Sequence, residues 1–186
     1  MRAVVELPVE DEADAPPPEY CDEALALRFA TTHAETLRYI AAWGRWYSWS
    51  GVVWAPDDTL AAFDLIRREC RAAAAELTAR NTSDTAKRQA AKVASGSTVA
   101  AVDRLARSDR RLAATVSQWD SERDVFTTPG EAKTIDLRTG KNRPARREDY
   151  STKCSAVAPK EMATPLWDGF IDRVTEGDPD LSACRN

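Results

Sequence analysis

The residues best suited to chemistry in this chain are six cations near its C-terminal end. They fall between positions 138 and 153, a stretch with only two acids: Arg138, Lys141, Arg143, Arg146, Arg147 and Lys153. Arginine and lysine side chains on a strand-and-turn segment can hold phosphates without reading base sequence. We therefore predict that these six residues contact nucleic acid, with an ordinary solvated loop as the alternative interpretation.

The aromatic stretch WGRWYSWSGVVW, residues 43–54, is a second feature that could bind nucleic acid. It holds four of the protein's six tryptophans: Trp43, Trp46, Trp49 and Trp54. Exposed rings stack on bases, whereas buried rings fill the space between a hairpin and amphipathic helices. Alternation along a strand puts Trp46 and Trp49 on opposite faces, so the four rings cannot form one flat row. We favour the hairpin core over the stacking platform.

The sequence contains no recognisable catalytic or metal-binding motif. Its only Gly-Lys pair is Gly140-Lys141, and Ile135 stands where a phosphate-binding loop requires glycine. The single histidine, His33, falls on the apolar stripe of a predicted helix, which favours a packed side chain. The cysteines lack metal-ligand spacing and are interpreted as buried or incidental thiols: Cys21, Cys70, Cys154 and Cys184. We predict no catalytic residue, no metal and no cofactor.

Charge is distributed unevenly along the 186 residues. Residues 1–24 carry eight acids and one base, a balance of −7, whereas the other 162 residues carry 25 bases and 22 acids, a balance of +3. A mildly basic body fits contact with nucleic acid but does not demand it. No stretch approaches the ~18–20 apolar residues of a membrane helix, and the N-terminus lacks the pattern of a signal peptide. We expect a cytoplasmic protein with no membrane partner.

The spacing of apolar residues predicts a helical protein. Residues 1–21 are acidic and proline-rich, and we expect a disordered tail there. A first helix is predicted from Asp22 through a stripe formed by Leu25, Phe29, His33, Leu37 and Ile40. A second runs from a cap at Asp57 or Asp58 along a face formed by Leu60, Phe63, Ile66, Cys70, Ala74 and Leu77. Shorter helices are predicted over residues 86–94, 99–105 and 112–119.

Two β elements interrupt or follow these helices. Residues 45–55 are predicted to form a hairpin with a two-residue turn at Ser50-Gly51. Residues 126–130 are predicted to form a turn, and residues 134–153 a short β element in which Glu148-Asp149 caps a turn or helix. A last helix, whose apolar face we expect to be exposed, carries Leu166, Phe170, Ile171 and Val174. The predicted class is mainly α (α+β): amphipathic helices with a small β-hairpin and a short C-terminal β element.

Several segments, taken in order, resemble one family. They are LRYIAAWGRWYSWSGVVW (37–54), DDTLAAFDLIRREC (57–70), LAATVSQWD (112–120), IDLRTG (135–140), REDYSTK (147–153) and PLWDGFIDRV (165–174). Over residues 23–180 the chain is similar to the helical domain before the superfamily-3 helicase motor in phage and plasmid primase-helicases, which are related to the poxvirus primase-helicase. It departs from the family pattern at Thr127, where asparagine is common, and in EAKT (131–134), which lengthens the turn.

The resemblance implies a domain at residues 22–180 that joins an upstream primase or DNA-binding region to a ring-forming ATPase, with residues 181–186 as the truncated start of a further helix. Since the motor is not in this sequence, we expect an excised module, a truncated product or a standalone relative, without ATP hydrolysis of its own. The expected function is a non-catalytic module of a DNA replication primase-helicase, in a bacterial host or phage-infected cell, that supports DNA contact or ring assembly.

The partners that the resemblance implies are single-stranded or forked DNA, a second copy of the chain, or a helicase motor. The alternative from a different class is an interaction protein that binds a helicase or a host protein without any role at DNA.

Overall fold

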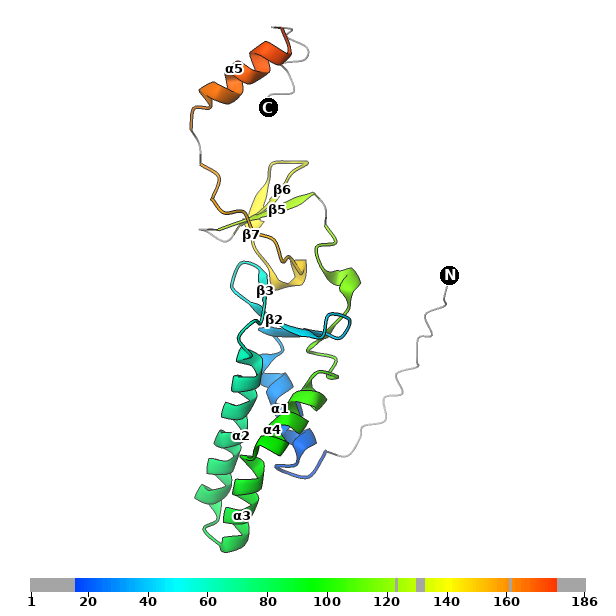
Figure 1. The fold of residues 1–186 in the computed structure, drawn as a ribbon, viewed down its shortest axis with the longest axis vertical. Helices are drawn as coiled ribbons and strands as arrows, with labels where there is room; N and C mark the ends of the chain where they lie inside the picture. Colours follow the sequence, from blue (N-terminus) through cyan, green and yellow to red (C-terminus); the bar gives the residue numbers. More distant parts are fainter. Residues whose placement is uncertain (1–15, 123, 130–132, 161, 177–186) are drawn as a thin grey trace, which may run out of the picture.

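The computed structural model describes residues 16–122, 124–129, 133–160 and 162–176. Most of the predicted acidic tail and the predicted helix start at residues 181–186 lie outside these ranges. The described residues form five α-helices and two small sheets, which confirms the α+β class. Figure 1 shows an elongated arrangement with a helical body at one end, the two sheets in the middle and the last helix at the other end. Among the described residues, no helix combines the length and apolar character that crossing a bilayer requires.

The helical body consists of α1 (Asp22–His33), α2 (Ala61–Arg80), α3 (Asp84–Val93) and α4 (Gly96–Ala106). Helix α2 packs along α3, and α1 packs along α4. Serine caps begin the two shorter helices, because Ser83 Oγ and Ser95 Oγ accept hydrogen bonds from backbone N–H groups three residues later. The predictions of α2, α3 and α4 are confirmed, and their buried faces share one core: Ala62, Ile66, Cys70, Ala73, Val93, Val99, Val102 and Ala106.

The predicted continuation of the first helix to Ile40 is wrong. Helix α1 ends at His33, and strand β1 (Leu37–Ile40) follows after a turn closed by the Thr36 N–H and the His33 carbonyl. Spacings of three residues fit both a helix face and the two sides of a strand. Here Leu37 enters the helical core, whereas Ile40 lies on the other side of the sheet, in a separate buried cluster.

The predicted helix over residues 112–119 is also wrong. Strand β4 (Ala113–Ala114) pairs in parallel with β1, and a single 3₁₀ turn, η1 (Val116–Gln118), follows it. Leu112 and Trp119 are buried in different clusters, while Val116 between them is exposed. Pairing with a strand more than seventy residues earlier in the chain therefore overrides the local helical spacing.

The tryptophan-rich stretch forms the predicted hairpin but with a longer loop. Strands β2 (Arg45–Trp49) and β3 (Trp54–Pro56) pair with Trp49 opposite Trp54, so four residues rather than two make the turn. Ser50 closes this loop, since its hydroxyl donates to the Val53 carbonyl at 2.7 Å and accepts from the Val53 N–H at 3.0 Å. Together with β1 and β4 these strands form sheet A, in the order β3-β2-β1-β4.

Trp46 and Trp49 lie on opposite faces of β2, as alternation predicts. Trp46 packs in the helical core beside Phe29 and Tyr39, and its indole N–H donates to buried Asp103 at 3.2 Å. Trp49 lies on the other side with Trp54. The hairpin-core interpretation is confirmed for Trp46 and Trp54, which are both buried, but not for Trp43, which is exposed.

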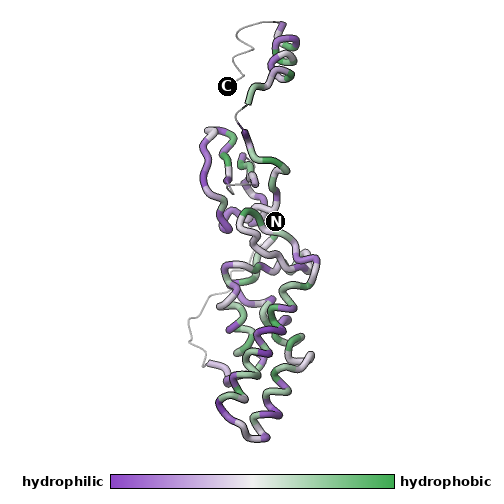
Figure 2. Tube along the Cα trace, turned by 90° about the vertical axis from the view of Figure 1, so that its left-hand side faces the viewer, coloured by the Kyte–Doolittle hydropathy of each residue, from purple (hydrophilic) through white to green (hydrophobic). Residues whose placement is uncertain are grey.

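Sheet B contains β5 (Val125–Thr128), β6 (Lys133–Asp136) and β7 (Asn142–Pro144) in antiparallel order, followed by a 3₁₀ turn, η2 (Arg147–Asp149). The segment predicted as a turn at residues 126–130 therefore begins as strand β5. The last helix, α5 (Pro165–Val174), is confirmed. It stands apart from the rest of the chain in both Figure 1 and Figure 2, and none of its residues is buried.

The start of α2 depends on Asp57 rather than on an apolar contact. Leu60, predicted in the core, is 72% exposed and has a left-handed backbone with φ of 61°. The Asp57 carboxylate instead accepts hydrogen bonds from the backbone N–H groups of Thr59, Ala61 and Ala62 at 3.1, 2.9 and 2.9 Å. Burial alone opposes ionisation of this carboxyl, but these bonds outweigh it and hold the pKa of Asp57 below its usual value.

We predict that Asp57→Ala lowers the free energy of unfolding by about 1 kcal/mol at pH 7, as loss of a helix cap does. Because the folded-state pKa of Asp57 is depressed, its stabilisation is complete above the unfolded pKa of about 4 and is lost as pH falls through the folded value. Urea unfolding at pH 7 and pH 3 measures both effects. Asp58→Ala, which removes an exposed neighbour, is the control; equal losses in the two variants would contradict the capping role.

Candidate nucleic-acid interface

The six predicted cations lie on sheet B and the segment that follows it. Arg138 and Lys141 belong to the turn between β6 and β7, Arg143 lies in β7, and Arg146 begins the η2 turn, in which Arg147 lies. Lys153 follows in an irregular segment. The structure therefore brings them to one part of the molecule, but the environments of their side chains differ.

Asp136 builds the turn that carries Arg138 and Lys141. Its carboxylate accepts from the Arg138 N–H at 2.8 Å and from the Thr139 hydroxyl at 3.0 Å, and its own N–H donates to the Lys141 carbonyl. Gly140 supplies the left-handed backbone, with φ of 66°, that ends this turn. The bonds from Arg138 and Thr139 lower the pKa of Asp136, so the turn keeps its carboxylate ionised.

Three of the six cations are paired with carboxylates. Arg143 makes a two-pronged bond to Asp149, with N–O distances of 2.7 and 2.8 Å, and this bond raises the arginine pKa. Arg147 pairs with Glu35 at the end of α1, and Arg138 pairs with Asp124 before β5. Their charges are compensated by carboxylates within the fold.

The other three cations, Lys141, Arg146 and Lys153, are exposed, and within the described ranges none of them forms an ion pair. We refer to them as the free cations. An exposed, uncompensated ammonium or guanidinium group is the kind that exchanges counterions for phosphates. The contact of the six residues with nucleic acid stays a prediction, and these three are the members whose charge is uncompensated.

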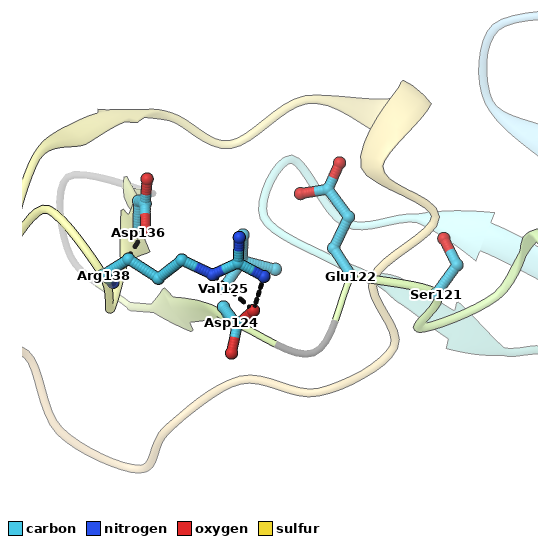
Figure 3. A pocket seen from close by; sticks show the side chains of 6 residues that line it. All are labelled: Ser121, Glu122, Asp124, Val125, Asp136 and Arg138. Carbon is cyan, nitrogen blue, oxygen red and sulfur yellow. Dashed lines mark hydrogen bonds and ion pairs between the residues drawn. The ribbon is translucent and has the colours of Figure 1, made fainter.

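A hollow of about 440 Å³ beside sheet B is acidic rather than basic. Figure 3 shows its lining, in which Arg138 extends to Asp124 while Glu122 and Asp136 add two further carboxylates. Three carboxylates against one guanidinium make this hollow unsuitable for phosphate. Nor does any part of the described chain group three His, Cys, Asp or Glu side chains so that they could hold a metal ion.

The segment with Arg146 and Lys153 is anchored to sheet A through Trp54 and to the loop after η1 through Asp120, a residue for which the sequence predicted no role. The Trp54 backbone N–H donates to the Ser151 carbonyl at 2.9 Å, and its indole N–H donates to the Arg147 carbonyl at 2.8 Å. Asp120 accepts from the Thr152 N–H at 2.8 Å and from its hydroxyl at 2.6 Å. The two contacting segments, SQWD (117–120) and YST (150–152), both belong to the quoted stretches 112–120 and 147–153, but spacing alone does not show that they meet, because they lie about thirty residues apart in the chain.

The histidine and the cysteines lie in environments that suit packing or capping. His33 is half-buried against Phe29, with ring centres 4.5 Å apart, and burial lowers its pKa. Burial raises the pKa of Cys70 to about 11, so its thiol stays protonated at neutral pH. Cys21 Sγ accepts from the Ala24 N–H at the start of α1, and Cys154 is exposed. Cys184 lies outside the described residues.

These features define a class of protein: a small α+β module with a cationic turn segment on its second sheet. The chain belongs to the D5 N terminal like family, whose model matches residues 26–176. This is the domain that precedes the superfamily-3 helicase in poxvirus D5 and in phage and plasmid primase-helicases. The match confirms the resemblance seen in the ordered sequence segments. A comparison with curated proteins gave no match.

The division between paired and free cations predicts different effects on stability. Arg143→Ala leaves the mostly buried Asp149 carboxylate without its charged partner and is expected to lower the free energy of unfolding by about 1–2 kcal/mol. Arg146→Ala removes an exposed side chain and is expected to change it by less than about 0.5 kcal/mol. Chemical denaturation measures both. Equal values for the neighbouring arginines would contradict the division.

Proposed function

We propose that this chain is a non-catalytic module of a phage- or plasmid-type replication primase-helicase and that it holds single-stranded DNA through the phosphates. The free cations Lys141, Arg146 and Lys153 make the contact. The observation that carries the proposal is that they are exposed and uncompensated on a segment fixed by β7, η2 and the anchor to sheet A, while the other three cations of the same segment are neutralised. Family membership supports a place at DNA, because the related domains precede a helicase.

Phosphate contact makes a specific prediction about salt. Affinity for a single-stranded oligonucleotide falls with salt, with a slope of about −0.7 in log–log form per phosphate neutralised. Replacing all three free cations by Ala is therefore expected to weaken binding at low salt and to reduce that slope by about 2. Fluorescence anisotropy with labelled oligothymidylate, over a series of salt concentrations, measures both quantities.

The matched control removes three cations elsewhere. Lys87, Arg88 and Lys92 are exposed on α3, which lies at the far end of the helical body from sheet B in Figure 1. Their replacement by Ala changes the net charge equally and is expected to leave the slope nearly unchanged. If the unaltered chain does not bind the oligonucleotide at low salt, or if the two triple variants lose affinity equally, the DNA proposal is wrong. Either result would favour the interaction protein.

Helix α5 favours a second function, self-association in an assembly such as a ring. Its sequence PLWDGFIDRV places Leu166, Trp167, Phe170 and Val174 in solvent, with Leu166 90% exposed. A ten-residue helix is marginal in water unless its apolar face packs on something. We propose that this face packs against a second copy of the chain.

Sedimentation velocity over a concentration series tests this assembly. The parent chain is expected to shift from monomer to larger species as concentration rises, and Leu166→Ser combined with Phe170→Ser is expected to keep it monomeric. Since no α5 residue is buried, the double variant is expected to fold normally, which circular dichroism checks. Val157→Ser, an equally exposed apolar residue outside any helix, is the control. A monomer at every concentration contradicts the assembly role.

A further inference from the structure

One tryptophan of the aromatic stretch is left in solvent. Trp43 is 42% exposed, although Trp46 and Trp54 beside it in sequence are buried. It lies in the turn between β1 and β2, where its neighbours Ala41 and Ala42 are exposed as well. The core therefore does not require a large ring at this position.

The exposed ring is nevertheless held in place. The turn is closed by the Trp43 N–H to the Ile40 carbonyl at 3.1 Å and by Gly44, whose φ of 62° suits glycine. The indole contacts Tyr47 and Trp119 with ring centres 5.5 and 6.0 Å away, both tilted by 50°. Because neither ring is parallel to it, neither covers a face of Trp43 by stacking. A ring held before binding loses little entropy when a ligand stacks on it.

Trp119, behind Trp43, carries an unsatisfied donor. Its indole Nε1 is the one buried side-chain polar atom in the described ranges without a hydrogen-bond partner. The indole N–H groups of Trp46 and Trp54, by contrast, bond to Asp103 and to the Arg147 carbonyl. Because this atom is buried, Trp119 supports Trp43 through ring contact and does not offer its N–H to a ligand.

The same aromatic group packs against the chain segment that carries two of the free cations, Arg146 and Lys153. The Trp119 ring lies 5.2 Å from that of Tyr150, the residue that ends the turn begun by Arg146. Asp120, next to Trp119, bonds Thr152, and Lys153 follows directly. Aromatic rings together with uncompensated cations are the combination that binds single-stranded nucleic acid, since bases stack while phosphates pair.

We propose that Trp43, supported by Tyr47 and Trp119, is a stacking site for a nucleobase of a single strand. This inference rests on the proposed function, because the free cations hold the phosphates of the same strand. Tyr150, which contacts Trp119, lies four residues after Arg146 and three before Lys153, and this placement of two free cations favours a nucleic acid over an apolar peptide or a second copy as the occupant.

The test compares two probes of equal length and charge: oligothymidylate and the corresponding abasic oligonucleotide. Trp43→Ala is expected to weaken binding of oligothymidylate by about 5- to 150-fold and to leave binding of the abasic strand unchanged. Trp43→Phe, which keeps an aromatic ring, is expected to retain most of the affinity. Leu27→Ala on α1, which removes an exposed apolar side chain from the helical body, is the control and is expected to change neither affinity.

The outcomes separate this inference from the proposed function. If both strands bind and Trp43→Ala changes neither affinity, or lowers both equally, the stacking site is wrong while phosphate contact stands. If neither strand binds the parent chain at low salt, both proposals are wrong. Thermal unfolding of Trp43→Ala checks that the variant folds. If it does not, the affinities of Trp43→Phe for the two strands decide: retained affinity for both supports stacking, and an equal loss for both contradicts it. Loss of self-association in Trp43→Ala, with no effect on DNA, would assign the ring to a protein contact instead.

Discussion

The attachment of residues 147–151 to Trp54 is the interaction on which the arrangement of the candidate site depends. Trp54 is fully buried and uses both of its N–H groups to bond this segment, one to Ser151 and one to Arg147. Its ring lies nearly parallel to that of Tyr150, at 6.3 Å and 14°. Without this attachment, sheet B would be joined to the helical body mainly through the ion pair of Arg147 with Glu35 and the bonds of Asp120.

Charge compensation decides which cations remain available. Arg38 illustrates the structural use of a guanidinium in this molecule, since it lies over the Trp54 ring at 5.1 Å and donates to the Tyr150 hydroxyl. Two other arginines fix the η2 turn: Arg147 in the turn pairs with Glu35, and Arg143 in β7 pairs with Asp149 of the turn. Because these groups are occupied, a basic stretch in the sequence overstates the charge that a ligand meets. What remains is a small set of cations on a segment whose backbone is well fixed.

Local patterns predicted the elements whose faces are set by their own periodicity. Helix α2 follows from Ile66, Cys70 and their neighbours, and α5 from its apolar stripe. The failures occur where a distant partner decides. Leu37 and Ile40 continue the helical spacing of α1, but pairing with β2 and β4 makes them a strand that faces two separate cores.

The same distinction applies to the candidate site. The sequence located the basic segment, but the pairing of Arg147 with Glu35, 112 positions away, could not be read from spacing. The tryptophans show the same difference between local patterns and tertiary placement. Alternation correctly separated Trp46 from Trp49, yet the exposure of Trp43 follows from its place in the turn between β1 and β2, and β1 itself was predicted as helix.

The central claim is that one single strand contacts both the turn segment and the aromatic group around Trp43. The most direct measurement is a two-dimensional ¹⁵N–¹H spectrum of the tryptophan indole groups during titration with a short oligothymidylate. The arrangement predicts shifts of the Trp43 and Trp119 signals, while Trp46, whose indole N–H is bonded to Asp103 inside the helical core, stays in place. Saturating DNA that leaves Trp43 and Trp119 unshifted, or that shifts Trp46 alone, would contradict it.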